Sequence, residues 1–418
     1  MPDNNDGRGI KPLLNSNAAN RERIAKHCIF TLMRYLFILL FLLRQSTLQA
    51  NDTLVMSKLL QRIEALQPRE NGVFPQGSIP SYRMYAMNKD RFKADINPFF
   101  SALVGFTLRN LEDGLSPSQQ RQAARIIANT LPSFAKFINR KGQGTYNFWP
   151  TDTPKIFPNA GWMNWFDKKQ ALPDDLDDTV IILLAQQAND STAKAIHALM
   201  QEHANHTTGK IRNTFPEYRT LKAYSTWFGK RMPIDFDVSV LCNVLYFVQT
   251  YNLQWTEADS ASLFLIEDVI RTRKYINQPG LVSPHYATTP NILYHISRLM
   301  SVKPIPALDA LKPQLIDAAR QQLLSARTFM DEVILGTALL RWNEVPPQTA
   351  PHHARSLEEL VEDERFAFFI ANMSSLLPDP YRKWIASLKV TRFDYYSPAY
   401  NNVLLLEHLV WRSRLKNN

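Results

Sequence analysis

Six apolar segments of helical length recur along the chain, and they constrain its fold more than any other feature. Each segment opens on a polar or proline-marked turn and is then apolar almost all round, as in a helix that is buried on every side. Glycine accounts for only 13 of the 418 residues, and alternating strand-like patterns are hard to find. The sequence therefore predicts an all-α fold. The six segments span residues 96–111, 174–187, 235–251, 288–300, 330–342 and 397–411.

More polar, amphipathic segments lie between the apolar ones, and prolines mark the connecting loops. Buried helices that alternate with amphipathic helices predict two concentric layers. Six such pairs would make an (α/α)6 toroid, a double-layer α/α barrel, in a single domain over residues 51–418. The inner helices would run parallel, with their opening turns at one end of the ring. The amphipathic segments cover residues 116–138, 190–204, 256–276 and 309–326, with further candidates at 54–66 and 356–369.

The first 50 residues have the three-part pattern of a secretory signal. Arg34 precedes the apolar run YLFILLFLL at residues 35–43, and QSTLQA follows it, ending at Ala50. Nine apolar residues are too few to cross a bilayer, so we expect no stable transmembrane anchor after cleavage. Met33 would start a compact signal by itself, which would make residues 1–32 an untranslated extension. We expect an exported protein, periplasmic or extracellular; the alternative is a buried N-terminal helix.

The charge of the predicted mature chain argues against a nucleic-acid-binding protein, and its cysteine count excludes a protein stabilised by intramolecular disulfides. Residues 51–418 contain 41 Lys+Arg and 35 Asp+Glu, a net charge of +6 rather than the +10 of the whole chain. These charges are dispersed, so no nucleic-acid partner is expected. Cys242 is the single cysteine after the apolar run. It cannot form an intramolecular disulfide, and we expect a small core residue.

The segment LPDDLDDTVIILL, residues 172–184, places four aspartates at the start of the second apolar segment. A helix N-terminus favours negative charge, and Asp is a preferred N-cap residue. Capping explains one or two aspartates, not four. Carboxylates that lie so close repel one another, so one of them would keep its proton. A protonated carboxyl group above an apolar cavity can serve as a general acid.

The predicted toroid brings further polar residues to the same end of the ring. They come from the opening turns of the apolar segments, and Asp235 and Asp237 are the nearest candidates for a shared ligand site. The full set is Asp174, Asp175, Asp177, Asp178, Asp235, Asp237, Asn291, Asp331, Glu332, Asn401 and Asn402.

Aromatic residues gather in the same predicted region. The segment GTYNFWPTDTPKIFPNAGWMNWF, residues 144–166, lies just before the aspartates. Aromatic faces stabilise cations, stack on sugar rings and also simply fill cores. Beside an acidic cluster they predict the wall of a ligand cavity. The candidate wall residues are Tyr146, Phe148, Trp149, Trp162 and Trp165, with Trp227 before the third apolar segment and Tyr396 before the sixth.

Residues 175–179, DLDDT, resemble the DxDD(T) motif of class II terpene cyclases, which share an α/α toroid with protein prenyltransferase β-subunits. IDFDVSVLCNVLYF and SPAYNNVLLLEHL are similar to inner-helix segments of that superfamily. The resemblance implies that Asp177 protonates an alkene or epoxide of an isoprenoid substrate, with Asp175 and Asp178 as tuning neighbours. It covers roughly residues 95–410, the span between those segments. The glutamine–tryptophan repeats of triterpene cyclases are not evident.

Several alternatives remain open at this point. Asp174, Asp175 and Asp178 also fit a DDxxD pattern, which would bind Mg²⁺, although a second metal motif is not evident. A secreted (α/α)6 carbohydrate-active enzyme could pair Asp177 with Asp237 or Asp331. A non-catalytic binding protein could retain the toroid. The ligand would be a small molecule or a glycan in the central cavity. A deep apolar cavity in the structure would favour the cyclase. An open polar groove would favour the carbohydrate-active enzyme, and a ring whose centre is filled by side chains would favour the non-catalytic binding protein.

Overall fold

The computed structural model describes residues 52–152, 172–229, 232–349, 355–386, 388 and 391–417. The chain divides into two compact units, Met1–Val55 and Met56–Asn418, and the account below concerns the second. The predicted signal segment lies outside the described residues, as do Trp162 and Trp165. Within the described part of the chain, no helix is both long and apolar enough to span a membrane.

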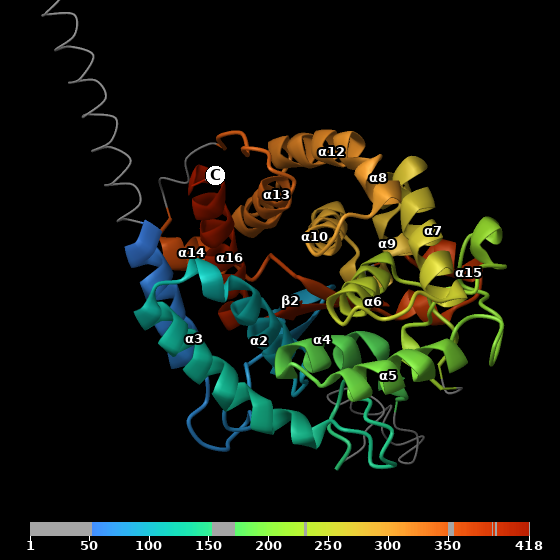
Figure 1. Ribbon diagram of the computed structural model, residues 1–418, viewed down its shortest axis with the longest axis horizontal. Helices are drawn as coiled ribbons and strands as arrows, with labels where there is room; N and C mark the ends of the chain where they lie inside the picture. Colours follow the sequence, from blue (N-terminus) through green and yellow to red (C-terminus); the bar gives the residue numbers. More distant parts are fainter. Residues whose placement is uncertain are drawn as a thin grey trace, which may run out of the picture. The chain divides into compact units, whose positions relative to one another are not determined.

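The six apolar segments form six helices whose ends lie within a few residues of those predicted. Each packs against the next in chain order, and the last packs against the first, so that the six helices close a ring (Figure 1). Nearly every residue of the first five helices is buried. These helices are α2 (Phe99–Leu111), α4 (Leu176–Gln186), α6 (Val238–Thr250), α10 (Thr289–Met300), α13 (Phe329–Arg341) and α16 (Pro398–Asn417).

Capping residues explain where four of these helices begin. Asp175 caps α4, Asp237 caps α6, Thr288 caps α10 and Thr328 caps α13, each through a side-chain oxygen that accepts a backbone N–H. Such a cap satisfies a donor that has no partner within the helix. The opening turns are therefore fixed locally by the sequence.

The amphipathic segments form helices outside this ring. Figure 1 shows α3 (Pro117–Thr130), α5 (Asp190–Glu202), α7 (Glu257–Arg271) and α12 (Lys312–Leu324) around it. Helix α3 packs on α2, α7 on α6 and α12 on α13. Residues 56–66 are also helical, as predicted. Shorter helices, α8 (Lys274–Asn277), α9 (Pro279–Val282), α11 (Pro306–Asp309) and α15 (Tyr381–Ala386), lie in the connections.

Helix predominates, which is compatible with the predicted all-α class, and a small sheet that was not predicted accompanies the helices. The strands β1 (Tyr82–Tyr85), β2 (Asn88–Ala94), β5 (Phe369–Asn372) and β6 (Arg392–Tyr396) form an antiparallel sheet of order β2-β1-β6-β5. The helix predicted over residues 356–369 is correspondingly short, α14 (Leu357–Val361), and the chain then enters β5. Pairing between segments some 300 residues apart overrides the weak local signal of such short strands.

A two-stranded ribbon lies directly before helix α4. Strand β3 (Asp174–Asp175) pairs with β4 (Trp227–Phe228) in antiparallel register, with Asp175 opposite Trp227. On its other side Asp175 bridges Tyr146. Backbone pairing therefore holds Asp175 on both sides, and Asp174 on one side, before the helix begins.

Candidate functional site

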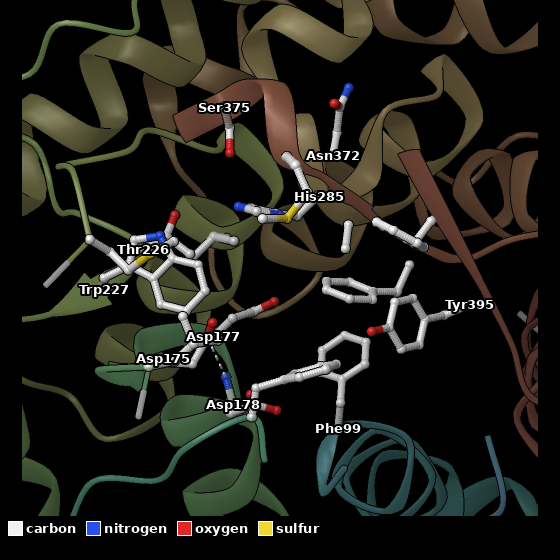
Figure 2. Close-up of a pocket in the computed structure, with 18 of the residues that line it drawn as sticks. Phe99, Asp175, Asp177, Asp178, Thr226, Trp227, His285, Asn372, Ser375 and Tyr395 are labelled. Carbon is white, nitrogen blue, oxygen red and sulfur yellow. Dashed lines mark hydrogen bonds between the residues drawn. The ribbon is translucent and has the colours of Figure 1, made fainter. Parts of the chain in front are cut away.

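A cavity of about 320 Å³ lies between the opening turns of α2, α4 and α6 and the four-stranded sheet. Asp175, Asp177 and Asp178 lie together at its edge, and Tyr395 lies across the space from them (Figure 2). Most of the remaining wall is apolar or aromatic. Its aromatic members are Phe99, Phe148, Trp149, Trp227, Phe369, Phe393 and Tyr395, together with the His285 ring.

Phe369 joins the aromatic wall into one packed group. Its ring centroid lies 4.9 Å from that of Phe99, 5.4 Å from that of Phe148 and 5.1 Å from that of Tyr395. Tilted and edge-on contacts of this kind fix the ring orientations. The wall is therefore preorganised, and its ring faces are available to a ligand.

Asp174 is the one aspartate of the four that does not line the cavity. Its carboxylate accepts hydrogen bonds from the side chains of Asn139 and Thr145, and from Asn147 over 3.4 Å. It therefore ties the loop at residues 139–147 to the start of β3.

Asp175 lines the cavity and caps α4. One of its oxygens accepts a hydrogen bond from the Asp178 backbone N–H over 3.0 Å. Burial and the neighbouring charge of Asp177 raise the pKa of Asp175 to about 7, against a weaker opposite effect of its hydrogen bonds and of His285.

Asp177 has a hydrogen-bond partner on each carboxyl oxygen. Oδ1 accepts from the Asn243 side-chain amide over 2.6 Å, and Oδ2 accepts from the Tyr286 hydroxyl over 2.5 Å. Burial raises the pKa of Asp177 to about 6, and these two hydrogen bonds limit the rise.

Asp178 differs from its neighbours because neither carboxyl oxygen has a hydrogen-bond partner among the described residues. The residue is 1% exposed and lines the cavity. Burial, followed by the charges of Asp175 and Asp177, raises its pKa well above the usual range. A buried carboxylate without donors is costly, so the surroundings of Asp178 favour its protonated form.

His285 lines the same cavity, lies above the three aspartates in Figure 2 and comes from the 3₁₀ turn η5 (Pro284–Tyr286). Its Nε2 bonds Asp235 over 3.1 Å, and its backbone N–H donates to Asp237 over 2.7 Å. Burial alone would lower the pKa of His285, but the hydrogen bond and charge of Asp235, with Asp237 and Asp175, raise it to about 9. His285 is therefore a cation at neutral pH.

Asp235 and Asp237 lie behind His285 and are not cavity residues. Asp235 also accepts a hydrogen bond from Asn213, and Asp237 caps α6 while accepting from Ser283. Both aspartates lie at the predicted end of the ring. Their carboxylates accept hydrogen bonds from the protein itself and do not face the cavity.

The predicted aromatic residues divide between the cavity and its supports. Phe148, Trp149 and Trp227 line the cavity. Tyr146 lies outside it and donates to Gln186 over 3.2 Å. Tyr396 also lies outside, where it donates to the Glu362 carbonyl over 2.8 Å. Its neighbour on β6, Tyr395, lines the cavity instead, because successive side chains of a strand point to opposite faces.

The other opening-turn residues serve the fold. The side chains of Asn291, Asn401 and Asn402 donate to backbone carbonyls. Asp331 completes the capping box of α13. Glu332 lies in the first turn of that helix and does not line the cavity.

Sequence reasoning missed Phe99 and Phe369, and it gave Tyr395 and His285 too little weight. The sequence carries a signal for His285, because Pro284-His285-Tyr286 stands just before the fourth apolar segment. Asp235 stands at the corresponding place before the third apolar segment. Phe369 carries no such signal, because it reaches the cavity only through strand pairing.

A magnesium site at Asp174, Asp175 and Asp178 does not fit the geometry. Asp174 points its carboxylate at Asn139 and Thr145, away from the cavity that the other two line. Across the described ranges, no group of three or more His, Cys, Asp or Glu side chains is arranged to hold a metal ion.

The arrangement can deliver one proton to an apolar ligand. A buried carboxylic acid, two neighbouring aspartates and a histidinium border a cavity whose remaining wall is largely aromatic.

A scan of protein-family models gives no match to this chain, and a search of curated proteins gives none either.

Proposed function

We propose that residues 56–418 form an (α/α)6 toroid related to that of class II terpene cyclases, and that the protein protonates a carbon–carbon double bond of an isoprenoid hydrocarbon. The closed ring of six buried helices supports the fold. The observation that carries the function is the carboxyl group of Asp178, which is buried at the edge of an aromatic cavity and has no hydrogen-bond partner within the described ranges.

The proposed reaction begins with transfer of the Asp178 proton to one carbon of the alkene. The π electrons form the new C–H bond, the other carbon becomes a carbocation, and Asp178 becomes a carboxylate. Intramolecular attack by further double bonds would close rings, and loss of a proton from carbon would end the reaction. The faces of Phe99, Phe148 and Phe369 would stabilise the intermediate cations.

The resemblance to the DxDD motif assigns the donor role to Asp177, whereas the hydrogen bonds favour Asp178. Asp177 already accepts from Asn243 and Tyr286, and a proton on Asp177 would lie within one of these bonds. Asp178 has no competing partner in the described part of the chain. We therefore propose Asp178 as the acid, with Asp175 and Asp177 as the charges that set its proton affinity.

An apolar hydrocarbon fits this cavity better than a glycan. A sugar ring needs several hydrogen-bonding groups, and a glycan-cleaving site needs two free carboxyl groups on opposite sides of the bond. Asp237 is occupied by Ser283 and His285, and Asp331 lies in the α13 cap. A hydrocarbon also suits the predicted export, since it partitions into membranes without a diphosphate.

The test is turnover of isoprenoid alkenes in D₂O. The full-length protein would be incubated with squalene, farnesol or geranylgeraniol, and products would be analysed by mass spectrometry. A protonation-initiated cyclisation gives a product that gains one deuterium on carbon. We expect Asp178→Asn to abolish this product and Asp317→Asn, on the exposed side of α12, to leave it unchanged. Product without carbon-bound deuterium, or an active Asp178→Asn variant, would contradict the proposal.

A further inference from the structure

Arg298 is a buried cation inside the helix ring. It comes from the last turn of α10 and is 3% exposed. Its guanidinium lies 5.3 Å from the ring centroids of both Phe106 and Tyr294. The neighbouring Arg341 pairs directly with Glu407, whereas no ion pair of Arg298 is found among the described residues. A buried charge of this kind needs compensation elsewhere.

The charge of Glu407 acts on Arg298 from within the ring, whereas hydrogen bonds link Arg298 to another carboxylate through one asparagine. Arg298 Nη2 donates to Asn243 Oδ1 over 2.6 Å, and Asn243 Nδ2 donates to Asp177 Oδ1 over 2.6 Å. Three inner helices, α10, α6 and α4, supply these residues in turn. The two short bonds connect the buried guanidinium to the acidic cluster.

The direction of each bond in this relay is fixed by chemistry. A guanidinium can only donate, so Asn243 must turn its carbonyl oxygen toward Arg298. Its NH₂ group then faces Asp177, and Asp177 Oδ1 can only accept. Asp177 could carry a proton only on Oδ2, where the Tyr286 hydroxyl lies at 2.5 Å. The relay therefore favours the ionised form of Asp177.

We propose that Arg298 is a positioning residue that acts through Asn243: it keeps Asp177 ionised and so leaves the proton of the cluster on Asp178. The catalytic role of Arg298 rests on the proposed function. The distribution of protons between Asp177 and Asp178 can be measured without a substrate. Without Arg298, burial would favour a neutral Asp177. Asp177 would then take up a proton of its own, while burial would still favour the protonated form of Asp178.

Other titratable groups surround Asp177, and Arg298 differs from all of them in its position. Asp175 and Asp178 lie on its own segment, and Asp237 lies at the start of α6. His285 and Tyr286 approach from η5, and Cys242 lies on α6. His285 and Arg83 are cations that line the cavity, but His285 bonds Asp235 and Arg83 lies on β1. Arg298 is the cation that reaches Asp177 through a hydrogen-bonded relay.

The experiment is infrared spectroscopy of the full-length protein labelled with ¹³C-aspartate. The carbonyl stretch of a protonated aspartic acid is distinct from carboxylate bands and shifts with the label. We expect the wild type to show protonated-aspartate bands, of which Asp178→Asn removes one and Asp177→Asn removes none. Arg298→Met should add a further protonated-aspartate band, and Asp177→Asn in that background should remove the added band. Arg298→Lys should restore the wild-type spectrum.

Arg341→Met is the matched control, because it also removes a buried guanidinium that packs on Tyr294. Any proton gained by its partner Glu407 would give an unlabelled band, so the aspartate bands should not change. Asn243→Leu breaks the relay without touching the arginine and should reproduce the effect of Arg298→Met if that variant does not fold. An unchanged aspartate spectrum in folded Arg298→Met, or in Asn243→Leu, would overturn the inference.

Failure of this inference and failure of the proposed function give different results. If no alkene is converted but the aspartate bands respond to Arg298 as described, the proton distribution stands and the reaction is wrong. If an alkene is cyclised with deuterium incorporation while substitution of Arg298 or Asn243 leaves the aspartate bands unchanged, the proposed reaction stands and the positioning role of Arg298 is wrong.

Discussion

The Asp178 backbone N–H donates a hydrogen bond of 3.0 Å to the Asp175 carboxylate, which makes Asp175 the N-cap of α4 and fixes Asp178 in its first turn. The four clustered aspartates consequently have four different environments. Asp174 binds the 139–147 loop and Asp177 accepts from Asn243 and Tyr286. Asp178 alone of the four has no partner for its carboxyl oxygens among the described residues.

The capping role of Asp175 can be separated from its charge by two substitutions. Asp175→Asn keeps a capping oxygen, whereas Asp175→Ala removes it, and both variants lose the carboxylate. We expect Asp175→Ala to be less stable than Asp175→Asn by about 1 kcal/mol. Urea denaturation at neutral pH measures this difference. Equal unfolding free energies for the two variants would show that the bond to Asp178 does not hold the helix start.

The cavity should bind a hydrophobic cation more tightly than a neutral molecule of the same shape. A tertiary amine with an alkyl chain is protonated at neutral pH and resembles a carbocation, and the aromatic wall and the Asp177 charge both favour it. We expect N,N-dimethyloctylamine at 100 times its Kd to stabilise the protein by about 2.7 kcal/mol. Octanol at the same concentration is the neutral control and should stabilise the protein less. Equal stabilisation by the two ligands, read as thermal shifts, would contradict this prediction.

Tyr395 and Tyr396 provide a matched pair on one strand. Tyr395 lines the cavity, whereas Tyr396 donates to the Glu362 carbonyl and packs near Tyr82 and Phe92. We expect Tyr395→Leu to weaken amine binding by roughly tenfold, the scale of one lost aromatic contact, and Tyr396→Leu to leave it unchanged. Titration calorimetry gives both affinities. Weaker binding in the Tyr396 variant would place the ligand elsewhere.

His285 should contribute stability that disappears at alkaline pH. Its pKa is raised to about 9 in the folded protein, against about 6.5 in an unfolded chain. The folded state therefore binds the extra proton between these values, and stability falls as pH rises through this window, by at most about 1.4 kcal/mol per pH unit. Denaturation of His285→Gln from pH 6 to 9 should show a shallower decline than wild type. An identical decline would mean that His285 is neutral in the folded protein.

Local signals allowed much of the helical framework to be predicted. Each inner helix combines an apolar run with a polar or proline-marked opening turn, and these features determine helix position without reference to the rest of the chain. The acidic segment predicted the cavity edge for the same reason, since Asp175, Asp177 and Asp178 belong to one cap and its first turn.

Long-range pairing explains what could not be predicted. Strands β1 and β6 are short and lie far apart in the sequence, so neither carries a strong signal alone. In the sequence, Arg298 resembles any cation in the last turn of a helix. Its hydrogen bond to Asn243 depends on how α10 packs against α6, which the local sequence does not specify. The choice between Tyr395 and Tyr396 depends on strand register, which the sequence around them does not fix.

The most direct test of the central claim is the pH dependence of unfolding free energy in wild type and Asp178→Asn. If Asp178 keeps its proton in the folded state, wild type loses stability as pH rises from about 4, the Asp value in an unfolded chain, toward the raised folded pKa. The variant has no such group. We predict that its stability relative to wild type rises between pH 4 and 7, by up to about 1.4 kcal/mol per pH unit. A relative stability that falls over this range would show an ionised, stabilising Asp178, and would contradict a proton held for catalysis.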